Sequence, residues 1–189
     1  KKDGRLTAAE AFILGDSGAY ASLGPYVMTR AATHSLGPYE VPNAKVDCYA
    51  MYTNNPPAGA YRGFGAPQAH FAAETQMDIL AEKLGISPFD LRRINALRVG
   101  ATTVTGQRLR ESVGLLETID RVAQAKGALT TADRPATRWR RGWGVASAYK
   151  NVGLGGGVPD SAGVEVELFD DGHVQVRAGA AEVGQGIVT

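Results

Sequence analysis

The stretch from Ala60 to Gln68 holds the residue types that could most readily do chemistry. It reads Ala-Tyr-Arg-Gly-Phe-Gly-Ala-Pro-Gln, with an arginine directly before two glycines that flank an aromatic residue. Arg62 offers a planar fork of donors suited to phosphate or carboxylate, and glycines let a backbone approach a ligand closely. A helical pattern follows Pro67, so we expect this loop at a helix N-terminus, where anions bind well. The alternative is a tight loop-to-helix junction that carries a surface arginine.

A second candidate site lies near the end of the chain, from Glu182 to Gly186. Here Gly184 and Gly186 can expose backbone N–H groups, and the carboxamide of Gln185 is both donor and acceptor. A phosphate or the edge of a heterocycle would suit such a loop. The spacing is neither a dinucleotide-binding fingerprint nor a Walker loop, because the further glycine and the Gly-Lys-Ser/Thr sequence are missing.

Composition excludes several classes of function. The chain has 20 basic and 19 acidic residues, so its charge gives no reason to expect nucleic acid or an anionic membrane surface as a partner. No apolar run is long enough to span a membrane. His34, His70 and His173 are too far apart for a zinc pattern, and no motif for covalent catalysis is present, so we predict neither metal ligands nor catalytic residues.

The single cysteine, Cys48, excludes an intrachain disulfide and fits a reducing, cytoplasmic compartment. We expect it to be a small core residue on a strand. The chain lacks an initiator methionine and stops just after a glycine-rich motif, so we expect a piece of a longer protein.

The order of hydrophobic patterns predicts an α+β fold. Asp3-Gly4 is expected to form a hairpin turn, followed by strands at 5–14 and 45–52 with a helix at 26–36 between them. The strongest helix is predicted at 69–84, with Gly85 ending it. Its buried stripe is expected to contain six apolar residues: Ala72, Ala73, Met77, Ile79, Leu80 and Leu84.

Two further helices are predicted. Ser87 is an N-cap before Pro88, and a third helix covers 115–126. Arg92 and Arg93 are expected to face solvent. The predicted buried residues of these two helices are Leu91, Ile94, Leu97, Leu115, Ile119 and Val122.

The last part of the chain is predicted to be a separate, β-rich region. Residues 128–138 are small and polar and are interpreted as a linker, which divides the chain into regions 1–127 and 139–189. A β-hairpin is expected over 163–177, with a type I turn and a G1 bulge at Gly172.

These motifs, in this order, carry a resemblance to a known family. Thr53-Asn-Asn-Pro, Ala60-Tyr-Arg-Gly-Phe-Gly-Ala-Pro-Gln68, Asp78-Ile-Leu-Ala-Glu-Lys-Leu-Gly and Asp90-Leu-Arg-Arg-Ile-Asn95 resemble the molybdenum-binding subunit of the xanthine dehydrogenase/aldehyde oxidase family. Val183-Gly-Gln-Gly186 is similar to that family's second pterin-binding motif. The resemblance implies parts of two molybdopterin-binding domains, with mixed sheets packed by helices.

The resemblance also implies roles for particular residues. Tyr61, Arg62 and Gly63 would bind molybdopterin, together with Gly184, Gln185 and Gly186. Phe64 would wall the substrate, and Arg30, which lies 32 residues before Arg62, would orient it. The alternative for Arg30 is a helix arginine in a salt bridge.

The family hydroxylates heterocycles or aldehydes with water-derived oxygen, and its cofactor often carries a cytosine dinucleotide in bacteria. The implied partners are an iron–sulfur subunit, an FAD subunit and the rest of the same subunit. The family's general-base glutamate has no counterpart here, so this piece is not expected to turn over alone. The alternatives are a carbon monoxide dehydrogenase-like subunit and a catalytically silent structural or assembly module.

Overall fold

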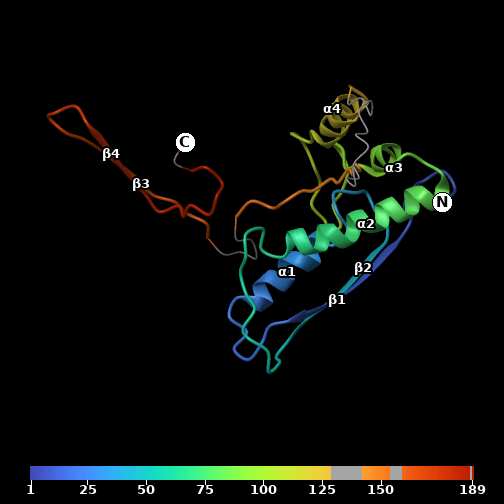
Figure 1. The fold of residues 1–189 in the computed structure, drawn as a ribbon, viewed down its shortest axis with the longest axis horizontal. Helices are drawn as coiled ribbons and strands as arrows, with labels where there is room; N and C mark the ends of the chain where they lie inside the picture. Colours follow the sequence, from blue (N-terminus) through green and yellow to red (C-terminus); the bar gives the residue numbers. More distant parts are fainter. Residues whose placement is uncertain (129–141, 154–158, 188) are drawn as a thin grey trace, which may run out of the picture. The chain divides into compact units, whose positions relative to one another are not determined.

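The structure is a computed structural model that describes residues 1–128, 142–153, 159–187 and 189. These residues form two compact units, Lys1–Lys150 and Asn151–Thr189 (Figure 1). Mixed helices and small sheets confirm the predicted α+β class. The predicted linker at 128–138 lies outside the described residues apart from Ala128, so that domain boundary stays a prediction.

The first unit begins with a β-α-β arrangement. Strand β1 (Ala9–Asp16) pairs in parallel with β2 (Ala44–Met51), and helix α1 (Gly24–His34) connects them. A turn closes from the Gly4 N–H to the Lys1 carbonyl, and the strand after it begins at Ala9 rather than Arg5, so the hairpin at Asp3-Gly4 stays a prediction. Parallel pairing requires the long crossover that α1 provides.

The inner face of this small sheet packs against α1. β1 alternates strictly between half-buried and exposed residues, as a strand with one covered face should. A Cβ on Gly15 would lie 2.2 Å from the sulfur of Met28, so the flexible Met28 side chain of α1 fills the space beside this glycine and would have to shift to admit another side chain. Cys48 lies on β2, as predicted, but it is half-buried rather than in the core, and its thiol donates to the Met28 carbonyl at 3.4 Å.

Helix α2 (Ala66–Leu84) is the longest helix and starts three residues earlier than predicted. Gly85 ends it in the left-handed conformation, which confirms the predicted C-terminal glycine. Its buried stripe differs from the prediction, because Ala72, Ile79 and Leu84 are exposed. Met77 is buried as predicted, and the other buried residues of this helix are Ala66, Ala69, His70, Glu74 and Ala81.

Helices α3 (Pro88–Asn95) and α4 (Leu115–Ala128) complete the first unit. Ser87 caps α3 by accepting the Phe89 N–H at 3.3 Å, which confirms the predicted N-cap. Ile119 is buried as predicted, whereas Ile94 and Val122 are 38% and 52% exposed.

The expectation that Arg92 faces solvent is wrong, because its side chain is fully buried. It lies in the core where α2 and α3 pack together. Two clusters make up that core. The larger contains Leu36, Tyr39, Val41, Met77, Ala81 and Leu91. The smaller contains Phe89, Ala96 and Ile119.

The second unit contains an antiparallel hairpin of β3 (Val164–Leu168) and β4 (Val174–Ala178). Gly172 has φ +87° and donates to the Phe169 carbonyl at 2.9 Å, which matches the predicted turn with a left-handed glycine. Both strands are exposed on every residue.

Among the described residues, no helix is both long and apolar enough to cross a membrane.

Candidate functional site

The Arg62 loop, residues 61–65, leads directly into α2 and has an unusual backbone. Gly63, Phe64 and Gly65 all have positive φ, at 96°, 53° and 90°. Two hydrogen bonds close the loop, from the Phe64 N–H to the Tyr61 carbonyl and from the Ala66 N–H to the Gly63 carbonyl. Phe64 is the exceptional residue here, because a left-handed conformation costs an L-residue about 1–2 kcal/mol.

Packing explains why this loop needs its glycines. A Cβ on Gly65 would lie 2.2 Å from the Val27 carbonyl oxygen and 3.0 Å from the Ala31 nitrogen, both in the backbone of α1. A Cβ on Gly63 would lie 2.3 Å from Cγ of Pro67. The loop is therefore pressed onto α1, and its conformation is set by that contact.

The outward side of the loop presents a cation. Tyr61 is 81% exposed, and Arg62 is exposed as well. Within the described parts of the chain, the Arg62 guanidinium has no hydrogen-bond or ion-pair partner. The N-terminus of α2 has no side-chain cap and no acidic residue in its first turn. An exposed guanidinium beside an uncapped helix N-terminus is an arrangement that favours an anion.

Arg30 lies on the stretch of α1 that the loop touches. It stands between Val27 and Ala31, the two residues whose backbone atoms face Gly65. The structure thus brings the α1 segment that contains Arg30 against the Arg62 loop, although the two arginines are 32 positions apart. The predicted substrate role of Arg30 stays a prediction.

The second predicted loop, in the unit Asn151–Thr189, is organised around its own carboxylate. Glu182 accepts the N–H groups of Gly184 at 2.5 Å, Gly186 at 3.2 Å and Ile187 at 2.6 Å. Hydrogen bonds from these amides, that of Ile187 first, hold the pKa of Glu182 below its ordinary value. Backbone amides of this loop can therefore converge on one anionic group.

Gln185 also turns back onto this loop. Its Oε1 accepts the Val183 N–H at 2.7 Å and its Nε2 donates to the Ala181 carbonyl at 2.7 Å. Gly184 and Gly186 have φ of 94° and 82°, which favour glycine. The predicted ligand role of Gln185 remains a prediction, since both ends of its carboxamide contact its own backbone here.

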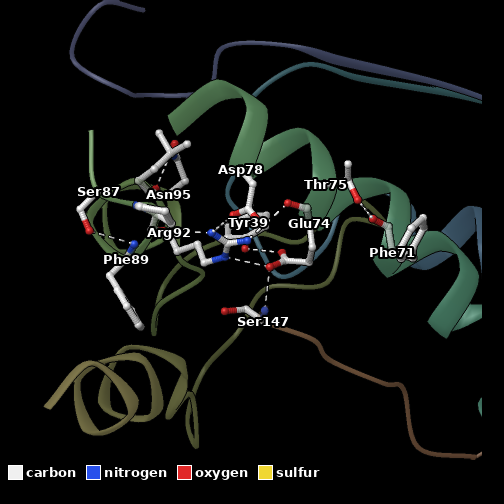
Figure 2. Close-up of polar contacts among 12 residues, drawn as sticks. Tyr39, Phe71, Glu74, Thr75, Asp78, Ser87, Phe89, Arg92, Asn95 and Ser147 are labelled. Carbon is white, nitrogen blue, oxygen red and sulfur yellow. Dashed lines mark hydrogen bonds and ion pairs between the residues drawn. The ribbon is translucent and has the colours of Figure 1, made fainter. Parts of the chain in front are cut away.

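Sequence reasoning missed a buried polar cluster in the first unit (Figure 2). Glu74 on α2 accepts hydrogen bonds from the Tyr39 hydroxyl, from Nε of Arg92 at 2.8 Å and from the Ser147 N–H at 2.7 Å. Arg92 also contacts Asp78 at 2.8 Å. Burial, and then the hydrogen bond to Glu74, raise the pKa of Tyr39. The missed signal was the spacing of Glu74 with His70, Met77 and Ala81, which places it on the buried stripe.

Three rings form a second group that the sequence did not reveal. Tyr149 lies 5.0 Å from His34 and 5.7 Å from His70, measured between ring centroids. The Tyr149 hydroxyl donates to the Thr33 carbonyl at 3.1 Å. Burial lowers the pKa of both histidines, which disfavours their charged form. The described residues contain no group of three or more His, Cys, Asp or Glu side chains that could hold a metal ion.

Two parts of the chain match a known family of protein domains. Residues 1–96 match a molybdopterin cofactor-binding domain, and residues 116–189 match a second domain of the same description. The chain is 54% identical over 123 residues to the nicotinate dehydrogenase large molybdopterin subunit of Eubacterium barkeri, covering 65% of this chain and 29% of that protein. It is 34% identical over 193 residues to a xanthine dehydrogenase molybdenum-binding subunit of Escherichia coli, covering 100% and 25%.

Solved structures agree with these sequence matches. The aldehyde oxidoreductase of Desulfovibrio desulfuricans matches with a TM-score of 0.63 and 34% identity, over 67% of this chain and 14% of that one. The chain spans about a quarter of the length of the two sequence relatives named above. On these matches, the chain belongs to the molybdopterin cofactor-binding family of xanthine dehydrogenase and aldehyde oxidoreductase subunits.

Proposed function

We propose that the chain is part of the catalytic subunit of a molybdenum hydroxylase, which oxidises a heterocycle or an aldehyde with water-derived oxygen. The observation that carries this proposal is the Arg62 loop. It offers an exposed guanidinium without a described partner at the uncapped N-terminus of α2, inside a region that matches a molybdopterin cofactor-binding domain.

The residues of both loops fit an anionic cofactor such as molybdopterin. Arg62 would bind it through charge-assisted hydrogen bonds, with the backbone of Tyr61 and Gly63 beside it. Gly184, Gln185 and Gly186 would bind through amides that already converge on a carboxylate. When bound, the cofactor supplies the metal and the redox chemistry.

The chain's own contribution is binding and orientation. The left-handed turn at Gly63–Gly65 fixes the position of the main chain next to Arg62, because the backbone of α1 packs against Gly65. Phe64 would present an aromatic wall to a flat substrate, and Arg30 would orient it. We assign no general base within the chain, so activity requires residues from elsewhere in the complete subunit.

The substrate class follows from the relatives. The relative with 54% identity is named for nicotinate, a ring heterocycle, and the structural relative is named for aldehydes. We propose an aromatic heterocycle as the first class to screen and an aldehyde as the second. The complete enzyme would carry iron–sulfur clusters and FAD on partner domains or subunits, a cytosine dinucleotide form of the cofactor, and a cytoplasmic location.

The test of this proposal uses the native, full-length protein in its complex. Metal analysis should find molybdenum, and oxidation of the released cofactor should give pterin fluorescence. A screen of purines, nicotinate-type rings and aldehydes should then find oxidation of one class. Absence of both molybdenum and pterin would contradict the proposal and favour a catalytically silent module of the same fold.

A further inference from the structure

Glu74 collects hydrogen bonds from three separate segments of the first unit. Its partners are Tyr39, which lies between α1 and β2, Arg92 on α3, and the main chain at Ser147. Figure 2 shows these groups pointing at one carboxylate. Glu74 is 6% exposed, Tyr39 1% and Arg92 0%, so water does not compete for these bonds. Glu74 is therefore the acceptor that these three buried hydrogen bonds share.

The chemistry of this network requires an acceptor at position 74. The Arg92 guanidinium and the Ser147 N–H can only donate, and both reach Oε2 of Glu74, whereas the Tyr39 hydroxyl reaches Oε1 and can donate or accept. Arg92 additionally donates to the Asp78 carboxylate at 2.8 Å and to the Pro88 carbonyl at 3.1 Å, so its charge keeps further acceptors. A carboxamide at position 74 could still offer its oxygen to Arg92 and Ser147 with its N–H toward Tyr39, so an apolar side chain of similar length, such as methionine, is needed to remove the acceptor.

The bond to Ser147 differs from the other two because it holds main chain. Residues 142–150 are described without helix or strand, and Ser147 is 6% exposed within them. Its neighbours Ala146 and Ala148 are exposed. Ser147 belongs to the second matched family region, whereas Glu74 belongs to the first. One carboxylate on α2 thus anchors the main chain of the following region.

We propose that Glu74 is a positioning residue, whose carboxylate fixes the main chain around Ser147 on α2, the helix that begins at the Arg62 loop. If Glu74 only stabilised the fold, removing its acceptor would speed amide exchange to a similar extent near Tyr39, Arg92 and Ser147. A positioning role makes the geometry of residues 142–150 depend on Glu74 itself. The link from this geometry to the cofactor rests on the proposed function, but the positioning of Ser147 does not.

Amide hydrogen exchange on the full-length protein tests the positioning directly. Glu74→Met should speed exchange at the Ser147 amide by about tenfold or more, the loss expected for a bond to a charged group. Peptides from α2 and α3 should change less. Asp78→Asn is the matched control, because Asp78 is the second carboxylate that Arg92 contacts, and this variant should leave the Ser147 amide protected as in the wild type.

Two results would overturn the proposal. One is unchanged exchange at residues 142–150 in Glu74→Met. The other is a uniform acceleration across α2, α3 and 142–150, which would show a purely stabilising role. If Glu74→Met does not fold, residue-resolved exchange in the wild type decides, since the Ser147 amide must then be protected while those of Ala146 and Ala148 exchange faster. Equal exchange at all three would contradict the proposal.

The molybdenum content of the same purified variants separates this inference from the proposed function. We expect it to fall in Glu74→Met and to stay at the wild-type level in Asp78→Asn. Faster exchange at Ser147 with unchanged molybdenum would uphold the positioning role, and it would contradict the link from residues 142–150 to the cofactor.

Discussion

The two glycine loops of this chain have similar chemistry but are built in opposite ways. The Arg62 loop takes its shape from tertiary packing, since Gly65 lies against the backbone of α1. The loop at Gly184–Gly186 takes its shape from its own side chains, since Glu182 and Gln185 bond to its backbone. Both expose groups that suit an anion, but Arg62 has no described partner, whereas the amides of the second loop already hold a carboxylate.

Because the two loops are shaped by different contacts, we expect them to respond differently to a ligand. A loop shaped by packing is pre-organised, so a ligand there need not order it. A loop whose amides hold an internal carboxylate must exchange one anion for another or bind the ligand through other groups. We therefore expect substitution of Gly65 to affect the fold strongly and substitution of Arg62 to affect the cofactor strongly. Variants of the second should act locally.

The largest effect is expected from Gly65→Ala. The new Cβ would lie 2.2 Å from a backbone oxygen of α1, which cannot move away like a flexible side chain, and φ would stay at +90°. We expect the free energy of unfolding to fall by about 3 kcal/mol or more, combining overpacking and left-handed strain. Chemical denaturation of the purified full-length protein measures this loss.

Gly85→Ala is the control for that substitution. Gly85 also has positive φ, at +65°, but a Cβ there would meet nothing within 4 Å. It should cost only the backbone strain, about 1 kcal/mol. Equal losses in the two variants would show that α1 does not shape the Arg62 loop.

A smaller and more specific effect is expected from Phe64→Ala. If the ring walls the substrate, its removal should raise the KM for a flat aromatic substrate about 2- to 10-fold, the range of a single ring-stacking contact. Molybdenum content should not change. Steady-state kinetics and metal analysis of the same variant separate an effect on the substrate from an effect on the cofactor. Lost metal with unaltered kinetics would contradict the wall role.

The smallest effect is expected at Glu182 and depends on pH. Because amide hydrogen bonds hold its folded pKa below the ordinary value, the loop gains stability above that ordinary pKa and loses it as pH falls through the lowered one. The protection factors of the Gly184, Gly186 and Ile187 amides, which compare their exchange with the intrinsic rate at each pH, should fall at acidic pH. Glu182→Gln should remove this extra dependence, and its persistence would show that another group titrates.

Features with local causes were predictable from the sequence. Ser87 before Pro88, Gly85 after α2 and Gly172 in the hairpin each act within a few residues, and the structure has them as predicted. The placement of the Arg62 loop at a helix start followed from Pro67 and the apolar spacing beyond it.

Features that depend on tertiary packing were not predictable in the same way. Arg92 and Glu74 are charged residues on helices, so sequence alone favours solvent for both, yet they compensate each other in the core. Ile79 and Ile94 are apolar but exposed by 37% and 38%. The strand–helix–strand order was predicted from local patterns, but the parallel pairing of β1 with β2 and its register depend on contacts between segments far apart in the sequence.

The most direct measurement is the molybdenum and pterin content of the full-length Arg62→Ala variant. A charge-assisted contact contributes about 1.5–3 kcal/mol, so occupancy at limiting cofactor should fall about tenfold or more. Arg121→Ala is the matched control, since Arg121 is an exposed arginine on α4 that pairs with Glu117, and this variant should load normally. Undiminished molybdenum and pterin in Arg62→Ala would contradict the claim that the Arg62 loop binds the cofactor.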